Sequence, residues 1–360
     1  MTKSKQIDVY VILTGVSGNL GDAVIRRRVL KWCRGLGRIH AYIGKTTPGW
    51  LDQLALTADE KAYPARDRRQ WLKGLLSGGS KKVLVFDPGE VPLGREHLKS
   101  EIMFLAIVLA VRLRGGIVFR PPRAVGEVDR LVGLLYRISS KLSNVVLWRE
   151  RSSLSQMRVG RLVPDTAFAE PREEGMPWPE RREIVVSMRG KRAFPSDEWF
   201  AGITRYAVDN GMRIVALSQV DEDEVRTKQI ADRFGDLAEY VAWGTRGDLD
   251  HERLVRQRYL SSAIAISDRL HVLILAAQAG AMPVEIAHSP KPKVEQHFAT
   301  IGMTGLSLRS DGKSADEITA FLASQHARRA DLSTKMAAAA TALADEIASF
   351  RSTVSSGRTG

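Results

Sequence analysis

Short apolar runs alternate with longer helical stretches along most of this chain, and that alternation constrains its fold more than any other feature. The runs lie at residues 8–13, 39–43, 82–86, 117–119 and 144–148, and again at 184–188, 213–217, 240–243, 263–266 and 283–286. Short strands separated by helices indicate βαβ units and parallel sheets. We therefore expect an α/β protein with two Rossmann-like domains, whose strands end at a central cleft.

A proline-rich segment separates the two sets of strands. Pro171, Pro177 and Pro179 lie in a charged stretch, and proline fixes φ and removes a hydrogen-bond donor. An alanine-rich stretch near the end favours a helix, and the Ser/Gly-rich residues after Phe350 are expected to fray. The chain is thus predicted to have four parts: an N-terminal α/β domain (1–170), a linker (171–182), a C-terminal α/β domain (183–328), and a final helix with a frayed tail (329–360).

Length and residue content exclude several classes of protein. With 360 residues, the chain is long enough for two buried cores. Its one cysteine, Cys33, excludes a disulfide framework and a cysteine-based zinc site, and fits a reducing compartment. The longest apolar run, 102–111, is shorter than the roughly 20 residues that span a bilayer. Residues 9–13 resemble a first strand and lack a signal-peptide cleavage site, so we expect a cytoplasmic protein.

The net charge of +13, from 54 basic and 41 acidic residues, requires an explanation. Nucleic acid, an anionic membrane face, and a small substrate with phosphate and carboxylate groups are the candidate partners. No zinc-finger, RNA-recognition or basic-zipper pattern is present, and the basic residues are scattered through helices that also contain acids. A merely solvated basic surface would give the same surplus. Nucleic acid is therefore not an expected partner.

The first candidate site is a glycine-rich turn at residues 15–22 (GVSGNLGD), between the first strand and the first helix. Glycines let backbone N–H groups approach an anion, and a helix N-terminus adds partial positive charge. The turn matches neither a Walker loop nor a dinucleotide fingerprint. A tight turn with Asp22 as the helix N-cap explains the same residues, and the two interpretations stay open here.

The second candidate site is SDRLH at residues 267–271, directly after an apolar run. Arg269 offers a planar, bidentate fork for a carboxylate or phosphate. His271 begins the next helix and suits proton transfer near neutral pH. The alternative is a structural pair between Arg269 and a carboxylate, beside a core histidine.

Together, residues 18–22 and 267–271 resemble motifs of the polysaccharide pyruvyl transferase family. Two further segments agree and keep the family's order along the chain. Residues 147–154 with 164–168 resemble its R-D-x-x-S … D-x-A-F stretch, and residues 185–189 resemble its V-S-x-R strand end. The resemblance covers residues 11–302.

The resemblance implies transfer of the enolpyruvyl unit of phosphoenolpyruvate onto a sugar, forming a pyruvate ketal and releasing phosphate. Exopolysaccharide biosynthesis at the cell envelope is the implied setting. The resemblance also implies a GT-B-like fold and a reaction without a metal or other cofactor. This reaction requires an acid that protonates carbon, a base that accepts the hydroxyl proton, and fixed cations that bind the two anionic groups.

Site residues follow partly from the resemblance, which supplies His271, Arg269 and Lys293, and partly from residue type and place in the chain. His271 is the candidate acid/base, and Asp22 is the candidate hydroxyl base. Four cations are assigned to the donor: Arg269 as anion clamp, Lys293, Arg149 and Arg189. Lys293 is equally well explained as a solvated surface lysine. Four residues are assigned to the acceptor: Asn19, Gly21, Arg120 and Arg123.

The chain departs from the family pattern mainly in its first half. Residues 87–90 (DPGE) and 119–123 (FRPPR) stand where the family has glycine-rich segments, and Glu150 replaces an aspartate. Arg120 and Arg123 then add charge at an expected strand end, which suits an anionic or diphosphate-linked acceptor. The acceptor sugar itself stays open.

Two other functions remain compatible with the sequence. One is a GT-B nucleotide-sugar glycosyltransferase; the other is a non-enzymatic polyanion-binding protein. A lipid-linked acceptor would allow peripheral contact with the inner, anionic face of the membrane. The basic residues expected to face that leaflet or a diphosphate are Arg26, Arg27, Arg28, Arg112, Arg114, Arg120 and Arg123. A homo-oligomer is also allowed.

Overall fold

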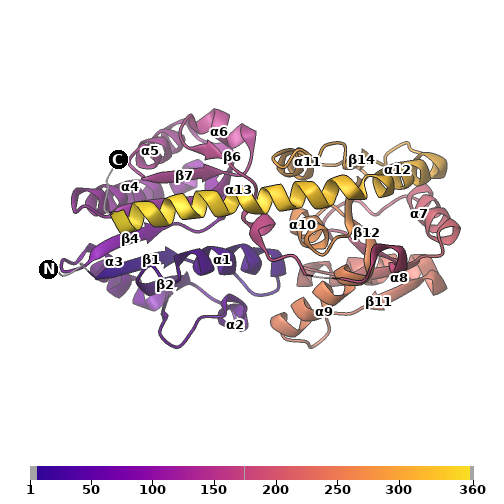
Figure 1. Cartoon of the computed structure of the whole chain (residues 1–360), viewed down its shortest axis with the longest axis horizontal. Helices are drawn as coiled ribbons and strands as arrows, with labels where there is room; N and C mark the ends of the chain where they lie inside the picture. The colour runs from indigo at the N-terminus through magenta and orange to yellow at the C-terminus, as the bar shows by residue number, and fades with distance from the viewer. Residues whose placement is uncertain (1–5, 174, 357–360) are drawn as a thin grey trace. The chain divides into compact units, whose positions relative to one another are not determined.

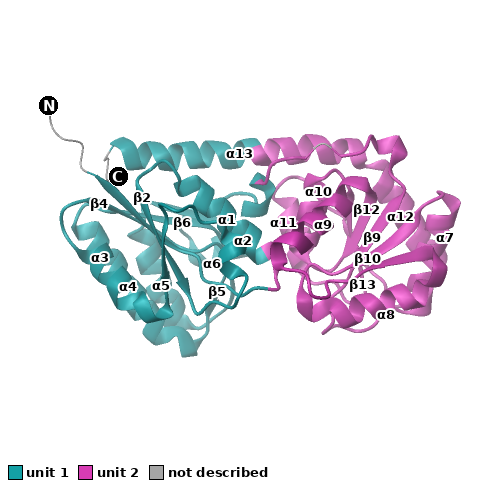
Figure 2. Ribbon diagram, turned by 90° about the horizontal axis from the view of Figure 1, so that it is seen from below, with its two compact units in different colours: residues 1–17, 22–169, 341–360 teal, residues 18–21, 170–340 magenta. Residues whose placement is uncertain are grey.

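The computed structural model describes residues 6–173 and 175–356 (Figure 1). Residue contacts divide the chain into two compact units (Figure 2). Unit 1 comprises residues 1–17, 22–169 and 341–360, and unit 2 comprises residues 18–21 and 170–340. The glycine-rich turn thus contributes four residues to unit 2.

Unit 1 contains an eight-stranded parallel sheet. Its order is β3-β2-β1-β4-β6-β7-β8, and β5 pairs with β6. The strands are β1 (Ile7–Ile12), β2 (Arg38–Gly44), β3 (Lys61–Pro64), β4 (Lys81–Val85), β5 (Gly89–Leu93), β6 (Ile117–Val128), β7 (Val145–Trp148) and β8 (Arg161–Leu162).

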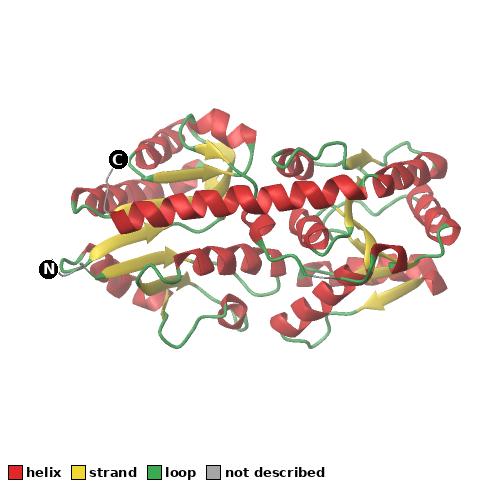
Figure 3. Cartoon of the chain, viewed as in Figure 1, coloured by secondary structure: helices red, strands yellow, loops and turns green. Residues whose placement is uncertain are grey.

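Helices flank this sheet (Figure 3). They are α1 (Leu20–Cys33), α2 (Trp50–Leu54), α3 (Arg68–Leu76), α4 (Leu98–Leu113), α5 (Arg130–Lys141), α6 (Arg151–Met157) and the second part of α13 (Arg329–Ser356), with 3₁₀ turns at Ala65–Asp67, Arg95–His97 and Thr166–Ala169. One core cluster joins the aromatic side chains of Tyr10, Tyr63, Trp71 and Phe86 with apolar residues of α4.

Unit 2 contains a six-stranded parallel sheet in the order β11-β10-β9-β12-β13-β14. Its strands are β9 (Glu183–Ser187), β10 (Arg213–Leu217), β11 (Ala238–Val241), β12 (Ser262–Ser267), β13 (Met282–Ala287) and β14 (Ser307–Arg309). Its helices are α7 (Asp197–Asp209), α8 (Glu224–Phe234), α9 (Asp248–Ser261), α10 (Leu270–Gln278), α11 (Pro292–Ala299), α12 (Ala315–Ala327) and the first part of α13, with 3₁₀ turns at Trp178–Glu180, Asp221–Asp223 and Gly235–Leu237.

The α/β class with two parallel, Rossmann-like sheets is confirmed. In each unit the first strand in chain order lies inside the sheet, and the order reverses beside it. Such a switch point is where α/β sheets bind ligands, outside the carboxyl ends of their strands.

The segment predicted to be a linker, 171–182, is counted with unit 2. Arg181 is buried there and donates hydrogen bonds to the carbonyls of Met176 at 3.0 Å, Ser262 at 2.9 Å and Ala279 at 2.9 Å. One arginine thus fastens the end of this segment to the body of unit 2.

Strand β6 continues well beyond the expected 117–119. It passes through Pro121 and Pro122, and its register against β7 shifts between Arg120 and Arg123. A proline is tolerated in a strand at such an irregularity because its missing N–H is not needed there. The expected strand end at Arg120 and Arg123 is therefore wrong, and both arginines are buried in the strand.

Helix α13 continues through Ser356, so the expected fraying after Phe350 is wrong for residues 351–356. Arg351 Nη1 donates to the carbonyls of Trp32 and Arg34, at 3.0 Å each. Val354 is buried, and its carbonyl accepts a hydrogen bond from Lys81 at 2.6 Å. These contacts hold the last turns in place. Residues 357–360 lie outside the described residues.

Candidate functional site

The glycine-rich turn and the start of α10 lie together in unit 2. Asn19 forms an isolated antiparallel bridge with Val220. Beside it, a Cβ added to Gly21 would lie 2.5 Å from the Cβ of His271, closer than two carbons can approach. Any side chain at Gly21 would therefore displace His271. The structure brings together these three predicted site residues: Asn19, Gly21 and His271.

One N–H group of this turn already faces a carboxylate of the protein. The backbone N–H of Gly18 donates to Asp248 Oδ2 at 3.2 Å. Gly18 has φ of 79°, and a Cβ there would lie 2.2 Å from the carboxylate of Asp221. Glycine is needed because this backbone conformation is strained for other residues and the space is filled. The anion at the turn is thus, in part, the protein's own Asp248.

Asp22 lies in the first turn of α1 and not at its N-cap, because the helix begins at Leu20. The N-cap interpretation is therefore wrong. In this position the carboxylate lies near the positive end of the helix dipole, and its Oδ1 is 3.9 Å from Arg26 Nη1. Its side chain is 42% exposed. The role of hydroxyl base stays a prediction.

Arg269 is held by two carboxylates of unit 2. Its Nε pairs with Asp223, and its Nη2 lies 3.2 Å from Glu222 Oε1. Although burial opposes the charge, the bonds to Asp223 and Glu222 raise the pKa of Arg269 above its usual value. The structural pair considered above is therefore present. Arg269 carries a fixed positive charge, and its role as anion clamp stays a prediction.

Arg189 lies just after β9 and close to Arg269. Its backbone N–H donates to Asp268 Oδ1 at 2.9 Å, and its Nε to the carbonyl of Asp268 at 3.3 Å. Burial and the neighbouring Arg269 lower the pKa of Arg189 from its usual value. Two guanidinium groups that repel each other favour the arrival of an anion, which would relieve that repulsion.

A cavity of about 270 Å³ opens beside Arg189, wholly within unit 2. Arg192 and Lys291 join Arg189 in its lining, together with Asp268 and His288. Arg192 Nε lies 3.2 Å from Asp268 Oδ2. Arg192 Nη1 is buried and has no hydrogen-bond partner among the described residues. Arg226 lines the cavity as well, and its buried Nε likewise has no hydrogen-bond partner among the described residues. The cavity thus has four cations, and two of them have an unused donor.

Arg226 holds the loop that carries two of these cations. Its guanidinium donates to four carbonyls between residues 189 and 193, at 3.0 to 3.3 Å. Asp223 adds a hydrogen bond from the N–H of Gly190 at 2.8 Å. Since each contact is made to a backbone group of the loop, Arg226 and Asp223 fix the path of its main chain.

The predicted donor lysine, Lys293, lies in the first turn of α11. Its carbonyl accepts a hydrogen bond from His297 Nδ1 at 2.7 Å. Lys291, two residues earlier, is the lysine that lines the cavity. Arg192 and Lys291 were not predicted, although both stand within four residues of predicted site positions, Arg189 and Lys293.

Arg149 belongs to unit 1 and is buried in an ion pair. Its Nη1 lies 2.6 Å from Asp165 Oδ2, and both side chains are almost fully buried. The N–H of Ala167 donates to the other Asp165 oxygen at 2.8 Å. The two halves of the R-x-x-x-S … D-x-A-F pattern are thus joined to each other. The donor-binding role of Arg149 stays a prediction, and this pair is the competing explanation for its presence.

The acceptor arginines Arg120 and Arg123 line a second cavity, of about 350 Å³, inside unit 1. The Arg120 guanidinium lies 4.2 Å from the ring centre of Phe86 and 4.6 Å from that of Tyr136. Arg123 Nη2 lies 2.9 Å from Asp87 Oδ1. Burial lowers the pKa of Arg120, and an anion in the cavity would favour its charge.

Glu101 of α4 lines the same cavity and was not predicted. It is buried, and its Oε2 has no hydrogen-bond partner among the described residues. Burial raises the pKa of Glu101, and Arg120, Arg123 and His97 partly offset that effect. A buried carboxyl oxygen without a partner is costly. A ligand hydroxyl that donates to Glu101 would remove this cost.

The buried Glu285 on β13 predicts a pH dependence of stability. Burial raises its pKa to about 7 from an ordinary 4.5, while the hydroxyl of Ser307 donates to it at 2.6 Å. The folded state favours the protonated form, so its stabilising effect is complete below about pH 4.5 and is lost as the pH rises through 7. The difference is at most about 3 kcal/mol.

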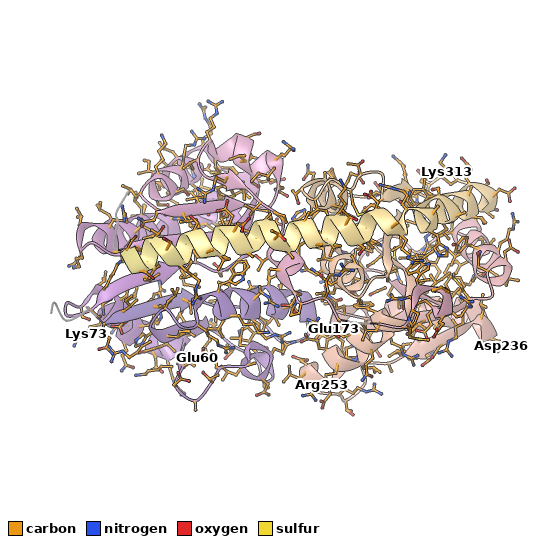
Figure 4. All side chains as sticks on the ribbon, in the orientation of Figure 1. Glu60, Lys73, Glu173, Asp236, Arg253 and Lys313 are labelled. Carbon is orange, nitrogen blue, oxygen red and sulfur yellow. The ribbon has the colours of Figure 1, made fainter. Side chains whose placement is uncertain are left out.

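We expect thermal unfolding to occur at a lower temperature near pH 8 than near pH 5, and Glu285→Gln to shrink that difference. The exposed Asp236 (Figure 4) provides the control, since Asp236→Asn should leave the difference unchanged. Equal pH sensitivity of the Glu285→Gln variant and the wild type would contradict the assignment.

Among residues 6–173 and 175–356, no three His, Cys, Asp or Glu side chains are grouped to hold a metal ion. The expectation of metal-free chemistry stays a prediction.

Solved structures support the same fold. A UDP-N-acetylglucosamine 2-epimerase of Neisseria meningitidis bound to UDP-GlcNAc has a TM-score of 0.55 at 12% identity, covering 92% of this chain and 94% of the other. A Listeria monocytogenes protein assigned as such an epimerase has a TM-score of 0.58 at 10% identity and 96% coverage of both chains. The structure of S. aureus MnaA with UDP has a TM-score of 0.52 at 9% identity, covering 92% of this chain and 90% of the other.

These similarities show that the chain is a two-domain, Rossmann-like α/β protein. Because the sequence identities are so low, they are evidence for the fold and not for the function. The comparison with curated proteins gives no match. The sequence model of polysaccharide pyruvyl transferases matches residues 19–288. The chain belongs to the polysaccharide pyruvyl transferase family, and it is a transferase.

Proposed function

We propose that this enzyme transfers the enolpyruvyl unit of phosphoenolpyruvate onto a sugar of a cell-surface polysaccharide or of its lipid-linked precursor. Family membership supports the reaction class. The observation that carries the choice of donor is the cavity of unit 2, with Arg189, Arg192 and Lys291 in its lining. Arg226 lines the same cavity, and a small ligand with both a carboxylate and a phosphate matches four cations in so small a space.

The proposed reaction balances as follows. A proton adds to the methylene carbon of phosphoenolpyruvate, and a sugar hydroxyl forms a C–O bond to C2. The C2–phosphate bond breaks, a second sugar hydroxyl closes the ketal, and phosphate leaves. Of the two hydroxyl protons, one replaces the proton given to carbon and the other leaves with phosphate. No oxidant or reductant is required.

The residues of unit 2 divide this work. Arg189, Arg192 and Lys291 bind the two anionic groups, and the unused Nη1 of Arg192 provides a ready donor. His271 donates the proton to carbon. Arg269, fixed by Asp223 and Glu222, adds positive charge as the phosphate departs.

The acceptor occupies the cavity of unit 1 in this proposal. Its aromatic lining, including Tyr42, Trp71 and Tyr136, offers flat apolar faces for a sugar ring. Glu101 accepts a hydrogen bond from a sugar hydroxyl. The buried charge of Arg120 favours an acceptor with an anionic group.

Phosphate release with phosphoenolpyruvate and a panel of glycosides tests the reaction. Arg192→Met is expected to raise the KM for phosphoenolpyruvate by about tenfold to a hundredfold, as for a lost charged hydrogen bond. Arg253→Met is the control, since Arg253 (Figure 4) is 73% exposed on α9. An unchanged KM in Arg192→Met would contradict the donor site. Failure to release phosphate with every glycoside would contradict the function.

A nucleotide-sugar glycosyltransferase is the alternative, since the similar structures from S. aureus and N. meningitidis hold UDP or UDP-GlcNAc. A ligand that binds the folded state raises its unfolding temperature. Stabilisation by phosphoenolpyruvate and not by UDP-sugars favours the pyruvyl transferase. The opposite pattern favours the alternative.

A further inference from the structure

Helices α4 and α5 of unit 1 leave large apolar side chains exposed. Twelve large apolar side chains are exposed among the described residues. Six of them lie on these two helices, so the exposed apolar residues are clustered there. They form what we call the α4–α5 patch: Ile102, Leu109, Leu113, Leu131, Leu134 and Ile138. Exposed apolar groups gathered in one place mark an interaction surface.

The spacing places these residues on one face of each helix. Ile102, Leu109 and Leu113 are seven and four residues apart on α4, and Leu131, Leu134 and Ile138 repeat at three and four on α5. Residues at such spacings lie along one side of a helix. The two helices pack against each other, and Figure 2 shows them side by side with α3.

Positive charge predominates on the helices that carry the patch. From Ile102 to Arg114 and through α5 there are five cations and no acidic residue: Arg112, Arg114, Arg130, Arg137 and Lys141. The adjacent α3 adds the exposed cations Arg68, Arg69 and Lys73, the last labelled in Figure 4. The nearest carboxylates that reach the surface precede the two helices: the exposed Glu96 and Glu127, and the half-exposed Asp129, which caps α5.

The opposite side of α4 lines the cavity of unit 1. Glu101, Phe104 and Ile107 contribute to that lining, while Ile102 and Leu109 are exposed. One helix therefore separates the cavity from the apolar patch. Whatever covers the patch lies within one helix diameter, about 10 Å, of a ligand in the cavity.

We propose that the α4–α5 patch docks on an anionic lipid bilayer. An apolar face ringed by Lys and Arg is the arrangement that binds the headgroup region of anionic membranes. No helix among the described residues is both long and apolar enough to cross a membrane, so the contact is with the membrane surface. If the proposed function holds, this membrane contact brings the acceptor cavity close to lipid-linked sugars; this step of the inference rests on the proposed function. Arg120 and Arg123, which the sequence suggested for membrane contact, are both buried. The exposed residues of the α4–α5 patch take that role in this proposal.

Co-sedimentation with lipid vesicles tests the dock directly. The protein is expected to sediment with vesicles of phosphatidylglycerol and phosphatidylcholine, and much less with phosphatidylcholine alone. Added salt should weaken the binding. Leu109→Ser/Leu113→Ser/Leu134→Ser is expected to lower the bound fraction at least about tenfold, because three exposed leucines no longer enter the lipid. Arg114→Gln/Arg130→Gln/Lys141→Gln is expected to lower the affinity about fivefold for each charge removed.

The exposed Val208 and Val225 of unit 2 provide the matched control. Val208→Ser/Val225→Ser should bind vesicles like the wild type, and all variants should keep the wild-type unfolding temperature. Equal binding to neutral and anionic vesicles, or none to either, would overturn the proposal. So would a dimer in solution that the leucine variant turns into a monomer, since a second copy would then cover the patch.

Phosphate release with a water-soluble glycoside separates this proposal from the proposed function. The patch variants should keep that activity while they lose vesicle binding. A wild type that binds anionic vesicles but releases no phosphate would contradict the proposed function and leave the dock standing.

Discussion

Replacing His271 by alanine is expected to lower the rate of phosphate release by about a hundredfold to ten-thousandfold, the usual contribution of a positioned acid or base. His271 lies in the first turn of α10, next to Arg269 and against Gly21. In the proposed reaction, the methylene carbon must gain a proton before C2 becomes electrophilic. Steady-state phosphate release, together with thermal unfolding, measures both the activity and the integrity of the variant.

His288 provides the comparison, because it is the histidine in the lining of the unit 2 cavity. Its side chain is 52% exposed and lies 3.8 Å from Asp311. His288→Ala should retain most activity. Should His288→Ala be inactive and His271→Ala active, the proton donor is His288. A marked loss of unfolding temperature in His271→Ala would instead show that His271 serves the core.

The fold was largely predictable because apolar runs and helical stretches recur at regular intervals. The strands not predicted from the sequence are β3, β5, β8 and β14, of which β8 and β14 are the shortest and β5 contains both a glycine and a proline. β3 is only four residues long, begins with Lys61 and ends with Pro64, and β8 has two residues. Such strands carry too few apolar residues to show a period, and they form because a longer neighbour offers hydrogen bonds.

Individual residues of the site could be predicted from the sequence, but the partners that they contact could not. Arg269 and His271 could be chosen by type and position, but the carboxylates of Asp223 and Glu222 are more than forty residues away along the chain. Arg120 shows the same limit. Its neighbours Pro121 and Pro122 suggest a strand end, and its burial between Phe86 and Tyr136 depends on packing that no local pattern encodes.

Replacing Arg149 by methionine is expected to destabilise unit 1 by about 3–5 kcal/mol, the usual cost of stranding one member of a buried ion pair. Asp165 is fully buried and would lose its charged partner, while the N–H of Ala167 would still donate to it. Denaturant unfolding measures the loss. Arg151→Met, at an exposed position two residues away, should unfold like the wild type.

The double variant Arg149→Met/Asp165→Leu distinguishes the two roles of Arg149. Since it removes both charges from the interior, most of the lost stability should return. If Arg149 serves only the fold, the double variant also releases phosphate with an unchanged KM for phosphoenolpyruvate. If Arg149 binds the donor as well, stability returns while the KM stays about tenfold or more above the wild-type value. A fully stable Arg149→Met variant would contradict the structural role, because the buried Asp165 would then need no partner.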